Sequence, residues 1–166
     1  MKRLIAVVIA VLVCFGVGYT ARYIQASSIL TWYPFLVKPG LTPPNIVFPI
    51  AWSIIYLLMG ISVGLLWNKP AEIRNPAVWA FVVQLLLNFL WSVSFFYFRS
   101  PVLGVINILL LDVVVVYYVA EVYRINRLSA WLFLPYLLWL LFATYLNVYI
   151  CCLLYTSPSP RDISGS

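Results

Sequence analysis

The sequence predicts an all-α, polytopic membrane protein that folds as a compact bundle of five transmembrane helices. Of its 166 residues, 65% are hydrophobic and only 8% are charged, which is far outside the balance of a soluble globular domain. Three long stretches also lack any Lys, Arg, Asp or Glu, and they lie between Lys38 and Lys69, between Arg74 and Arg99, and between Arg127 and Arg161. Each stretch exceeds the roughly 20 apolar residues that cross a bilayer core as a helix.

The first transmembrane helix is expected at about residues 4–24, where LIAVVIAVLVCFGVGYTARYI follows Met-Lys-Arg. A basic start, an apolar middle and small residues near Ala21 are also typical of a cleaved signal peptide. The run alone favours neither interpretation. If it is a spanning helix, Arg22 lies at its exit from the membrane.

The second helix is expected at about residues 44–67, after a loop rich in prolines and aromatic residues. Each proline lacks a backbone N–H and restricts the residue before it, so this loop cannot be one continuous helix. We expect the loop to fold onto the membrane surface. Pro43 and Pro44 would then open the helix at its tolerated first positions, and Pro49 would distort its first turns.

Three further helices are expected at about residues 77–98, 102–123 and 129–150, separated by short polar links. Ser129 is the expected N-cap of the last of them. Because the connections are short, consecutive helices should be antiparallel neighbours. Residues 1–150 should therefore form a single membrane domain.

The distribution of basic residues predicts the orientation, because loops rich in Lys and Arg stay on the cytoplasmic side. With the N-terminus inside, the inner side carries Lys2, Arg3, Lys69, Arg74, Arg124 and Arg127, and the outer side carries Arg22, Lys38 and Arg99. We therefore expect the N-terminus inside and the aromatic loop outside.

Composition also excludes several classes of function. The formal charge is +6, but the ten basic residues are scattered singly or in pairs, so we expect no nucleic-acid partner. The chain has no histidine, which removes His-based acid–base catalysis and His-ligated metals. Its cysteines, Cys14, Cys151 and Cys152, lack zinc or redox spacing. We expect no metal site.

Aromatic residues make up 17% of the chain, including seven tryptophans. Most of them fit a belt at the membrane interface. Trp52, Trp91 and Trp139 fall deeper within the predicted helices. An indole N–H at such depth needs a partner, which is either another helix or a ligand.

Three predicted helix faces carry the candidate site residues, because residues about four apart share a face. They are Phe48, Trp52 and Tyr56; Gln84, Asn88 and Ser92, beside Trp91; and Trp139, Ala143, Leu146 and Asn147. Stacking rings with a few amides suit a flat, largely apolar ligand. The alternative is that the amides only bond helices to one another. For Gln84 and Asn147 the pattern favours neither, whereas for Trp52 and Trp139 we favour a ligand role.

Two other features lie within predicted spans. Asp112 is the one acidic residue deep in a span, and it has no basic partner at similar depth. We expect a neutral, hydrogen-bonded carboxyl at a helix contact, although intramembrane ionisable residues are also functional candidates. Gly60 and Gly64 form a GxxxG pattern, which permits close helix approach but is weak evidence for a dimer.

Three stretches occur in a familiar order, and they are WYPFLVKPGLTPPNIVFPIAWSIIYLLMGIS, QLLLNFLWSVSFF and LPYLLWLLFATYLNVYI. They resemble signatures of the TspO/MBR family, the tryptophan-rich sensory proteins related to the mitochondrial translocator, or peripheral benzodiazepine receptor. The resemblance covers about residues 4–150. Because the family keeps its first run as helix one, the resemblance favours a spanning helix over a signal peptide.

The resemblance implies a usually dimeric protein of a bacterial cell membrane that binds porphyrins, haem, sterols or benzodiazepine-like compounds between its helices. Trp52 and Trp139 match the pocket tryptophans that the family implicates in porphyrin breakdown. Other pocket positions match Tyr33, Phe48, Asn88, Trp91, Ala143 and Leu146, and Tyr56 often corresponds to another aromatic residue. The implied partners are the lipid bilayer, the ligand and a second copy of the chain. No cofactor is required, because porphyrin or haem is the ligand.

Three functions compete. The leading hypothesis is a membrane receptor or sensor for tetrapyrroles. The second is transport of a tetrapyrrole or sterol. The third is light-dependent porphyrin degradation, in which Trp52 and Trp139 would be electron donors because the sequence offers no metal site or general base.

Residues 151–166 are expected to be foreign to the protein. The segment CLLYTSPSPRD, residues 152–162, resembles the in-frame translation of a common transposase-based sequencing adapter, and ISGS would then be variable index sequence. The same segment fits a loose cholesterol-recognition pattern. An adapter origin leaves that pattern without weight.

Sequencing the gene from source DNA tests this expectation. The native reading frame should continue differently after codon 150 or 151, with further apolar helix residues. Finding the same 151–166 tail in the source DNA would contradict an adapter origin.

Overall fold

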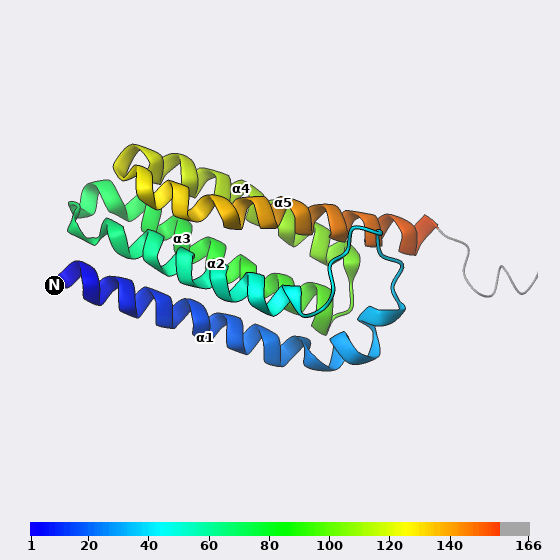
Figure 1. The fold of residues 1–166 in the computed structure, drawn as a ribbon. Helices are drawn as coiled ribbons and strands as arrows, with labels where there is room; N and C mark the ends of the chain where they lie inside the picture. Colours follow the sequence, from blue (N-terminus) through cyan, green and yellow to red (C-terminus); the bar gives the residue numbers. More distant parts are fainter. Residues whose placement is uncertain (157–166) are drawn as a thin grey trace, which may run out of the picture.

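The computed structural model describes residues 1–156, and within them it forms an elongated bundle of helices without strands (Figure 1). The five long helices are α1 (Lys2–Thr31), α2 (Val47–Gly64), α3 (Ala71–Ser92), α4 (Pro101–Ile125) and α5 (Arg127–Thr156). Three short helical turns, η1 (Tyr33–Phe35), η2 (Leu65–Asn68) and η3 (Val93–Tyr97), follow α1, α2 and α3. Five helices of the described part are long and apolar enough to cross a membrane. The predicted all-α fold is confirmed.

Each helix packs against two others, which places them around the bundle in the order α1, α2, α5, α4, α3. Consecutive helices run in opposite directions (Figure 1), as their short connections require. We call the half of the bundle that contains the start of α1 the lower half, and the half that contains the end of α1 the upper half. Large side chains fill the lower half. Phe81, Tyr118 and Phe133 meet there from α3, α4 and α5, with ring centroids 4.3–6.2 Å apart.

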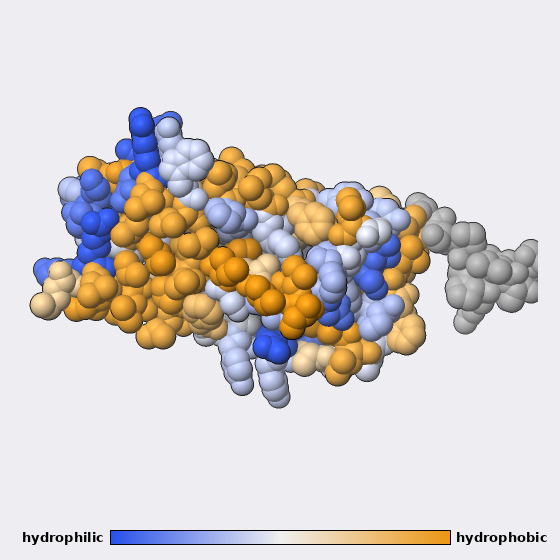
Figure 2. All heavy atoms as spheres, viewed as in Figure 1, coloured by the Kyte–Doolittle hydropathy of each residue, from blue (hydrophilic) through white to orange (hydrophobic). Residues whose placement is uncertain are grey.

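Hydrophobic atoms cover the middle of the bundle, and hydrophilic atoms gather at the end where α1 begins (Figure 2). This end also holds the α2–α3 and α4–α5 connections. The basic residues there are Lys2, Arg3, Lys69, Arg74, Arg124 and Arg127. The fold thus groups the six residues that the sequence assigned to one side, and the direction of insertion stays a prediction.

The first helix is longer than expected, because it ends at Thr31 instead of about residue 24. Its last turns are held by the α3–α4 connection. The Ser28 hydroxyl donates to the Phe96 carbonyl oxygen. Arg99 donates from Nε to Ser28 Oγ at 3.3 Å and from a terminal nitrogen to Thr31 Oγ1 at 3.0 Å. These are tertiary contacts, so the local sequence did not reveal the extension.

The second helix begins at Val47, after Pro43 and Pro44, and not at the prolines themselves. The Val47 amide donates to the Pro44 carbonyl at 3.0 Å, which makes a turn ahead of the helix. Pro49 therefore occupies the third helical position. The first amides of a helix have no intrahelical acceptor, so Pro49 removes no hydrogen bond there.

The third helix begins at Ala71, before Pro76, instead of at about residue 77. Arg74 stabilises this first turn by donating to the Lys69 carbonyl at 3.0 Å and by lying over the Trp67 ring at 4.7 Å. The helix then widens into the π-helical turn η3, where the Phe98 amide donates to the Val93 carbonyl at 2.9 Å. Propensity gives no sign of such a turn.

The fifth helix is capped by Asn126, not by Ser129. Asn126 Oδ1 accepts from the Leu128 amide at 3.0 Å and the Ser129 amide at 3.4 Å. Ser129 is fully buried, and its carbonyl accepts from the Ser62 hydroxyl at 2.8 Å. The helix continues past Ile150 to Thr156. Residues 157–166, which contain most of the expected adapter sequence, lie outside the described residues.

The GxxxG pattern brings α1 and α2 into backbone contact. A Cβ atom on Gly60 would lie 2.6 Å from the Val11 Cα and amide nitrogen, and Gly64 faces Val7 in the same way. Both glycines are buried. The GxxxG pattern therefore packs α2 against α1 of the same chain.

Gly60→Ala should therefore destabilise the bundle, because the new methyl group forces the α1 backbone away. The expected loss is about 1–3 kcal/mol, typical of an overpacked contact. It would be measured as a shift in SDS-induced unfolding followed by circular dichroism.

Gly16→Ala is the matched control. Gly16 lies on α1, and a Cβ atom added there would have no atom within 4 Å. It should be neutral or slightly stabilising. Equal destabilisation by the two substitutions would show that the glycines are not needed for close packing.

Candidate ligand-binding site

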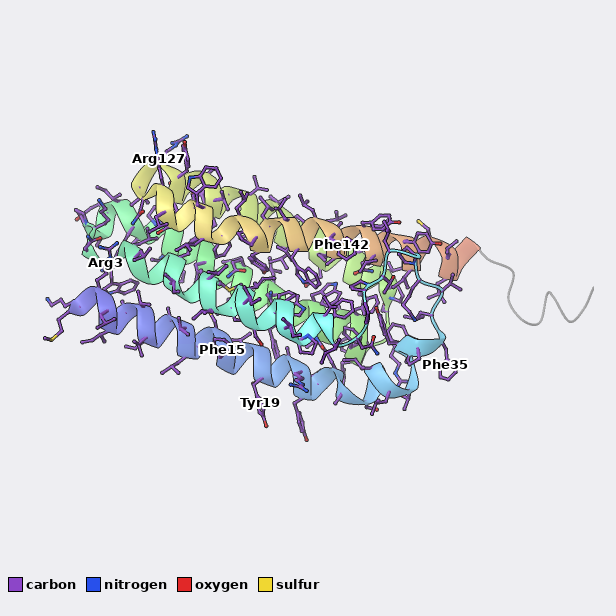
Figure 3. The ribbon with its side chains drawn as sticks, in the orientation of Figure 1. Arg3, Phe15, Tyr19, Phe35, Arg127 and Phe142 are labelled. Atoms are coloured by element: carbon purple, nitrogen blue, oxygen red, sulfur yellow. The ribbon has the colours of Figure 1, made fainter. Side chains whose placement is uncertain are left out.

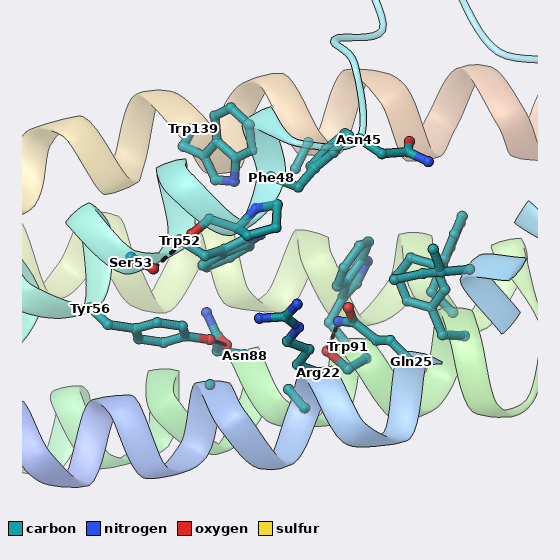
Figure 4. A pocket seen from close by; sticks show the side chains of 18 of the residues that line it. Arg22, Gln25, Asn45, Phe48, Trp52, Ser53, Tyr56, Asn88, Trp91 and Trp139 are labelled. Atoms are coloured by element: carbon teal, nitrogen blue, oxygen red, sulfur yellow. Dashed lines mark hydrogen bonds between the residues drawn. The ribbon is translucent and has the colours of Figure 1, made fainter. Parts of the chain in front are cut away.

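A cavity of about 640 Å³ opens in the upper half of the bundle, beneath the α1–α2 loop. Residues of α1, α2, α3, η3 and α5 line it, together with the loop (Figure 4). All nine residues that the sequence proposed as a site lie in its wall: Tyr33, Phe48, Trp52, Tyr56, Asn88, Trp91, Trp139, Ala143 and Leu146. The fold brings them together, and their role toward a ligand stays a prediction.

The wall formed by α2 and α5 is aromatic. Trp52 stacks on Tyr56 with ring centroids 5.5 Å apart and meets Trp139 edge to face at 6.4 Å. Phe48 also contacts Trp139 edge to face, at 5.8 Å. Phe48, Trp52 and Tyr56 are each four residues apart, which explains why one face of α2 presents all three rings.

Hydrogen bonds between helices fix the floor of the cavity. The Tyr56 hydroxyl donates to Asn88 Oδ1 at 2.9 Å, and Asn88 Nδ2 donates to the Tyr136 hydroxyl oxygen at 2.8 Å. Asn88 and Tyr136 are 4% and 1% exposed. This chain joins α2, α3 and α5, so it sets the spacing of the walls above it.

The two amides that the sequence left undecided have different positions. Gln84 lies outside the cavity lining, and its Nε2 donates to Met59 Sδ at 3.5 Å. Asn147 lines the cavity and also bonds across helices. Its Oδ1 accepts from the Trp91 indole at 2.9 Å, and its Nδ2 donates to the Pro101 carbonyl at 3.1 Å. Gln84 is thus a helix contact, and Asn147 holds Trp91 in place.

The indole groups of Trp52 and Trp139 differ from that of Trp91. Within residues 1–156, neither donates a hydrogen bond to another part of the chain. Both line the cavity, so their N–H groups are available to whatever fills it.

The first helix contributes a wall that the sequence analysis missed. Its lining residues are Phe15, Gly18, Tyr19, Ala21, Arg22, Gln25, Ala26 and Ile29. Most of them recur at spacings of three or four, which is the signal of one helix face. The sequence predicts the end of this helix near residue 24, with Arg22 at its exit, and therefore does not indicate this face.

Gly18 and Gln25 show how this wall is fitted to the others. A Cβ atom on Gly18 would collide with the Tyr56 ring, so this glycine lets Tyr56 lie flat against α1. Gln25 Nε2 donates to the Ser92 hydroxyl at 2.7 Å, which ties α1 to the end of α3.

The loop above the cavity is fixed by Lys38. Its ammonium donates to the carbonyls of Tyr33 at 2.8 Å and Leu36 at 3.2 Å, and lies 4.6 Å from the centre of the Tyr33 ring. Burial lowers the pKa of the Lys38 ammonium and raises the pKa of the Tyr33 phenol. Tyr33 faces the cavity, whereas Phe35 is 83% exposed and points away from the bundle (Figure 3).

The π-helical turn supplies two further lining residues that the sequence did not predict, Phe95 and Phe96. Phe95 stacks on Trp91 with centroids 5.2 Å apart. Phe96 packs against Tyr33 at 5.8 Å. A regular helix would not direct both consecutive rings into the core, and π-helical turns often occur at functional sites.

A model of the TspO/MBR family matches residues 10–153. The chain belongs to the TspO/MBR family. It is 38% identical over 145 residues to a tryptophan-rich protein TspO of Archaeoglobus fulgidus, an alignment that covers 87% of this chain and 92% of the relative. The corresponding protein of Chlorobaculum tepidum is 34% identical over 150 residues, covering 88% and 94%. The translocator protein of Homo sapiens is 33% identical over 130 residues, covering 76% of each chain.

Membership in this family agrees with the five apolar helices of the fold. This TspO/MBR protein is an integral, multi-pass membrane protein. The matched span includes every element that lines the cavity, apart from the start of α1, which carries no lining residue. The match to the family model therefore covers every lining residue, from Phe15 to Asn147.

Tyr136→Phe should loosen this site by removing the acceptor of Asn88 Nδ2. Hydrogen bonds between membrane helices contribute about 0.6 kcal/mol on average and up to about 1.7. Because Asn88 is buried and loses its partner, we expect a loss in the upper part of that range, measured by SDS-induced unfolding.

Tyr145→Phe is the control on the same helix, since Tyr145 is 44% exposed and its hydroxyl has no hydrogen bond within the described residues. It should leave stability unchanged. Equal stability of both variants would mean that the Tyr56–Asn88–Tyr136 chain does not hold the helices together.

Proposed function

We propose that this TspO/MBR protein is a membrane receptor or sensor that binds tetrapyrroles, such as porphyrin or haem, in the cavity beneath the α1–α2 loop. The cavity volume of about 640 Å³ is within the range of about 300–1,000 Å³ typical of small-molecule sites. Its aromatic walls offer faces on which a flat macrocycle can stack.

The observation that carries this proposal is the pair Trp52 and Trp139. Their rings meet edge to face at the cavity, and their indole N–H groups have no acceptor within residues 1–156. An indole N–H inside a membrane protein normally finds a hydrogen-bond partner. The indole of Trp91, which also lines the cavity, has one inside the protein. A ligand that stacks on these rings and carries a hydrogen-bond acceptor would satisfy the two indole N–H groups.

Transport is the second candidate, supported by the name of the human relative, translocator protein. A path across the membrane needs polar groups along the span. Asn107 donates to the Leu87 carbonyl at 2.8 Å, and Asp112 accepts from the Thr144 hydroxyl at 2.7 Å, so both are used in helix contacts. The cavity lining ends at Tyr56 and Asn88, above the filled lower half. We therefore rank binding first, and uptake of porphyrin by proteoliposomes would reverse that ranking.

The double variant Trp52→Phe, Trp139→Phe should weaken porphyrin binding by about tenfold or more. Each substitution removes an indole N–H donor, and a typical hydrogen bond contributes about 0.5–1.5 kcal/mol; about 1.4 kcal/mol is tenfold in affinity. Binding would be measured by quenching of the remaining tryptophan fluorescence in a protoporphyrin titration.

The matched control is Trp79→Phe with Trp131→Phe, which removes two tryptophans that are 67% and 62% exposed and outside the cavity. This variant loses the same number of tryptophans but should keep the wild-type affinity. Unchanged affinity in the cavity variant, or an equal loss in the control, would contradict the site assignment.

A further inference from the structure

Among the described residues, Arg22 is the only charged one that lines the cavity. It lies on α1, opposite the aromatic wall of α2 and α5. Figure 4 shows its side chain extending from α1 into the cavity, with the guanidinium group directed toward the Trp52 side. The basic group is thus presented to the site.

This cation has no partner in the protein. Within residues 1–156 no side chain or carbonyl forms an ion pair or hydrogen bond with Arg22, and no acidic residue lines the cavity. The other cations near this end are used: Lys38 binds loop carbonyls, and Arg99 binds Ser28 and Thr31. Arg22 is exposed where it lines the cavity, so its guanidinium is accessible and free to pair with an anionic group that enters beside the aromatic rings.

None of the described wall residues near Arg22 carries a negative charge. Gln25, one turn further along α1, is neutral and donates to Ser92. Asn88, across the cavity, has its oxygen and nitrogen engaged by Tyr56 and Tyr136. No group of the wall can neutralise Arg22. A carboxylate can, because its two oxygens accept parallel hydrogen bonds from the guanidinium fork.

We propose that Arg22 anchors a carboxylate, so that the cavity selects ligands with a flat apolar body and an anionic edge over neutral molecules of the same shape. The inference rests on the proposed function and sharpens it. A dicarboxylic macrocycle satisfies both the aromatic wall and Arg22, whereas a neutral sterol leaves the guanidinium unpaired. Because Arg22 projects from α1, the anionic edge of the macrocycle would lie toward α1 and its apolar body toward α2 and α5.

The test compares protoporphyrin IX with its dimethyl ester, which keeps the macrocycle and removes both negative charges. Wild-type protein should bind the acid about tenfold more tightly than the ester in fluorescence-quenching titrations in one neutral detergent. Arg22→Gln should reduce the affinity for the acid to that for the ester, with ester binding unchanged. Arg22→Lys should give an intermediate preference, because it keeps the charge and loses the fork.

Arg124→Gln is the matched control, since Arg124 is exposed at the opposite end of the bundle and the substitution removes the same charge. It should keep the wild-type preference. Circular dichroism and size-exclusion profiles check folding, and Arg22→Lys supplies the answer if Arg22→Gln fails to fold.

Two outcomes overturn the inference separately from the proposed function. If Arg22→Gln weakens acid and ester equally, Arg22 is a structural or membrane-surface residue. If it changes neither affinity, Arg22 does not contact the ligand. In both cases wild-type binding and its loss on changing Trp52 and Trp139 would still stand. If wild-type protein binds neither porphyrin, the proposed function fails and this inference fails with it.

Discussion

One face of α2 determines how the rest of the bundle is arranged. Residues four apart along it are Gly64, Gly60, Tyr56, Trp52 and Phe48. At the two glycines α1 approaches to backbone contact, and at Tyr56 it is kept one ring away, with Gly18 providing the room. Beyond Tyr56 the same face carries the rings of Trp52 and Phe48, which line the cavity. This stripe thus passes from glycines, where α1 touches α2, to aromatic residues that line the cavity between the helices.

An open upper half would be unstable unless other contacts held its walls, and polar side chains supply them. Ser28 and Arg99 tie the end of α1 to the α3–α4 connection, and Gln25 ties it to Ser92. Asn88 joins three helices at the floor. In a bilayer no water competes for these groups, so each polar side chain must find its partner inside the protein. The indoles of Trp52 and Trp139 have no partner within the described residues and line the cavity, so they are available to a ligand.

The cavity is consequently asymmetric in its chemistry. The α2–α5 wall is aromatic and neutral, and the α1 wall carries a cation. Apolar stacking provides affinity for any flat molecule, whereas a cation in the wall discriminates among such molecules, because only an anionic ligand can pair with it. Relatives that share the aromatic residues and differ at the position of Arg22 would then share a ligand shape without sharing a ligand.

The sequence alone determined the number of helices, the pairing of consecutive helices and the aromatic face of α2, because hydrophobic length and four-residue spacing are local properties. It also indicated that Trp52 and Trp139 belong to one site. It did not reveal the wall of α1, the widening at Phe95 and Phe96, or the different positions of Gln84 and Asn147. These depend on contacts between helices far apart in the chain, such as Ser28 with Phe96 and Trp91 with Asn147. Tertiary structure decided them, because a polar group in a membrane takes whichever partner the packed bundle brings within reach.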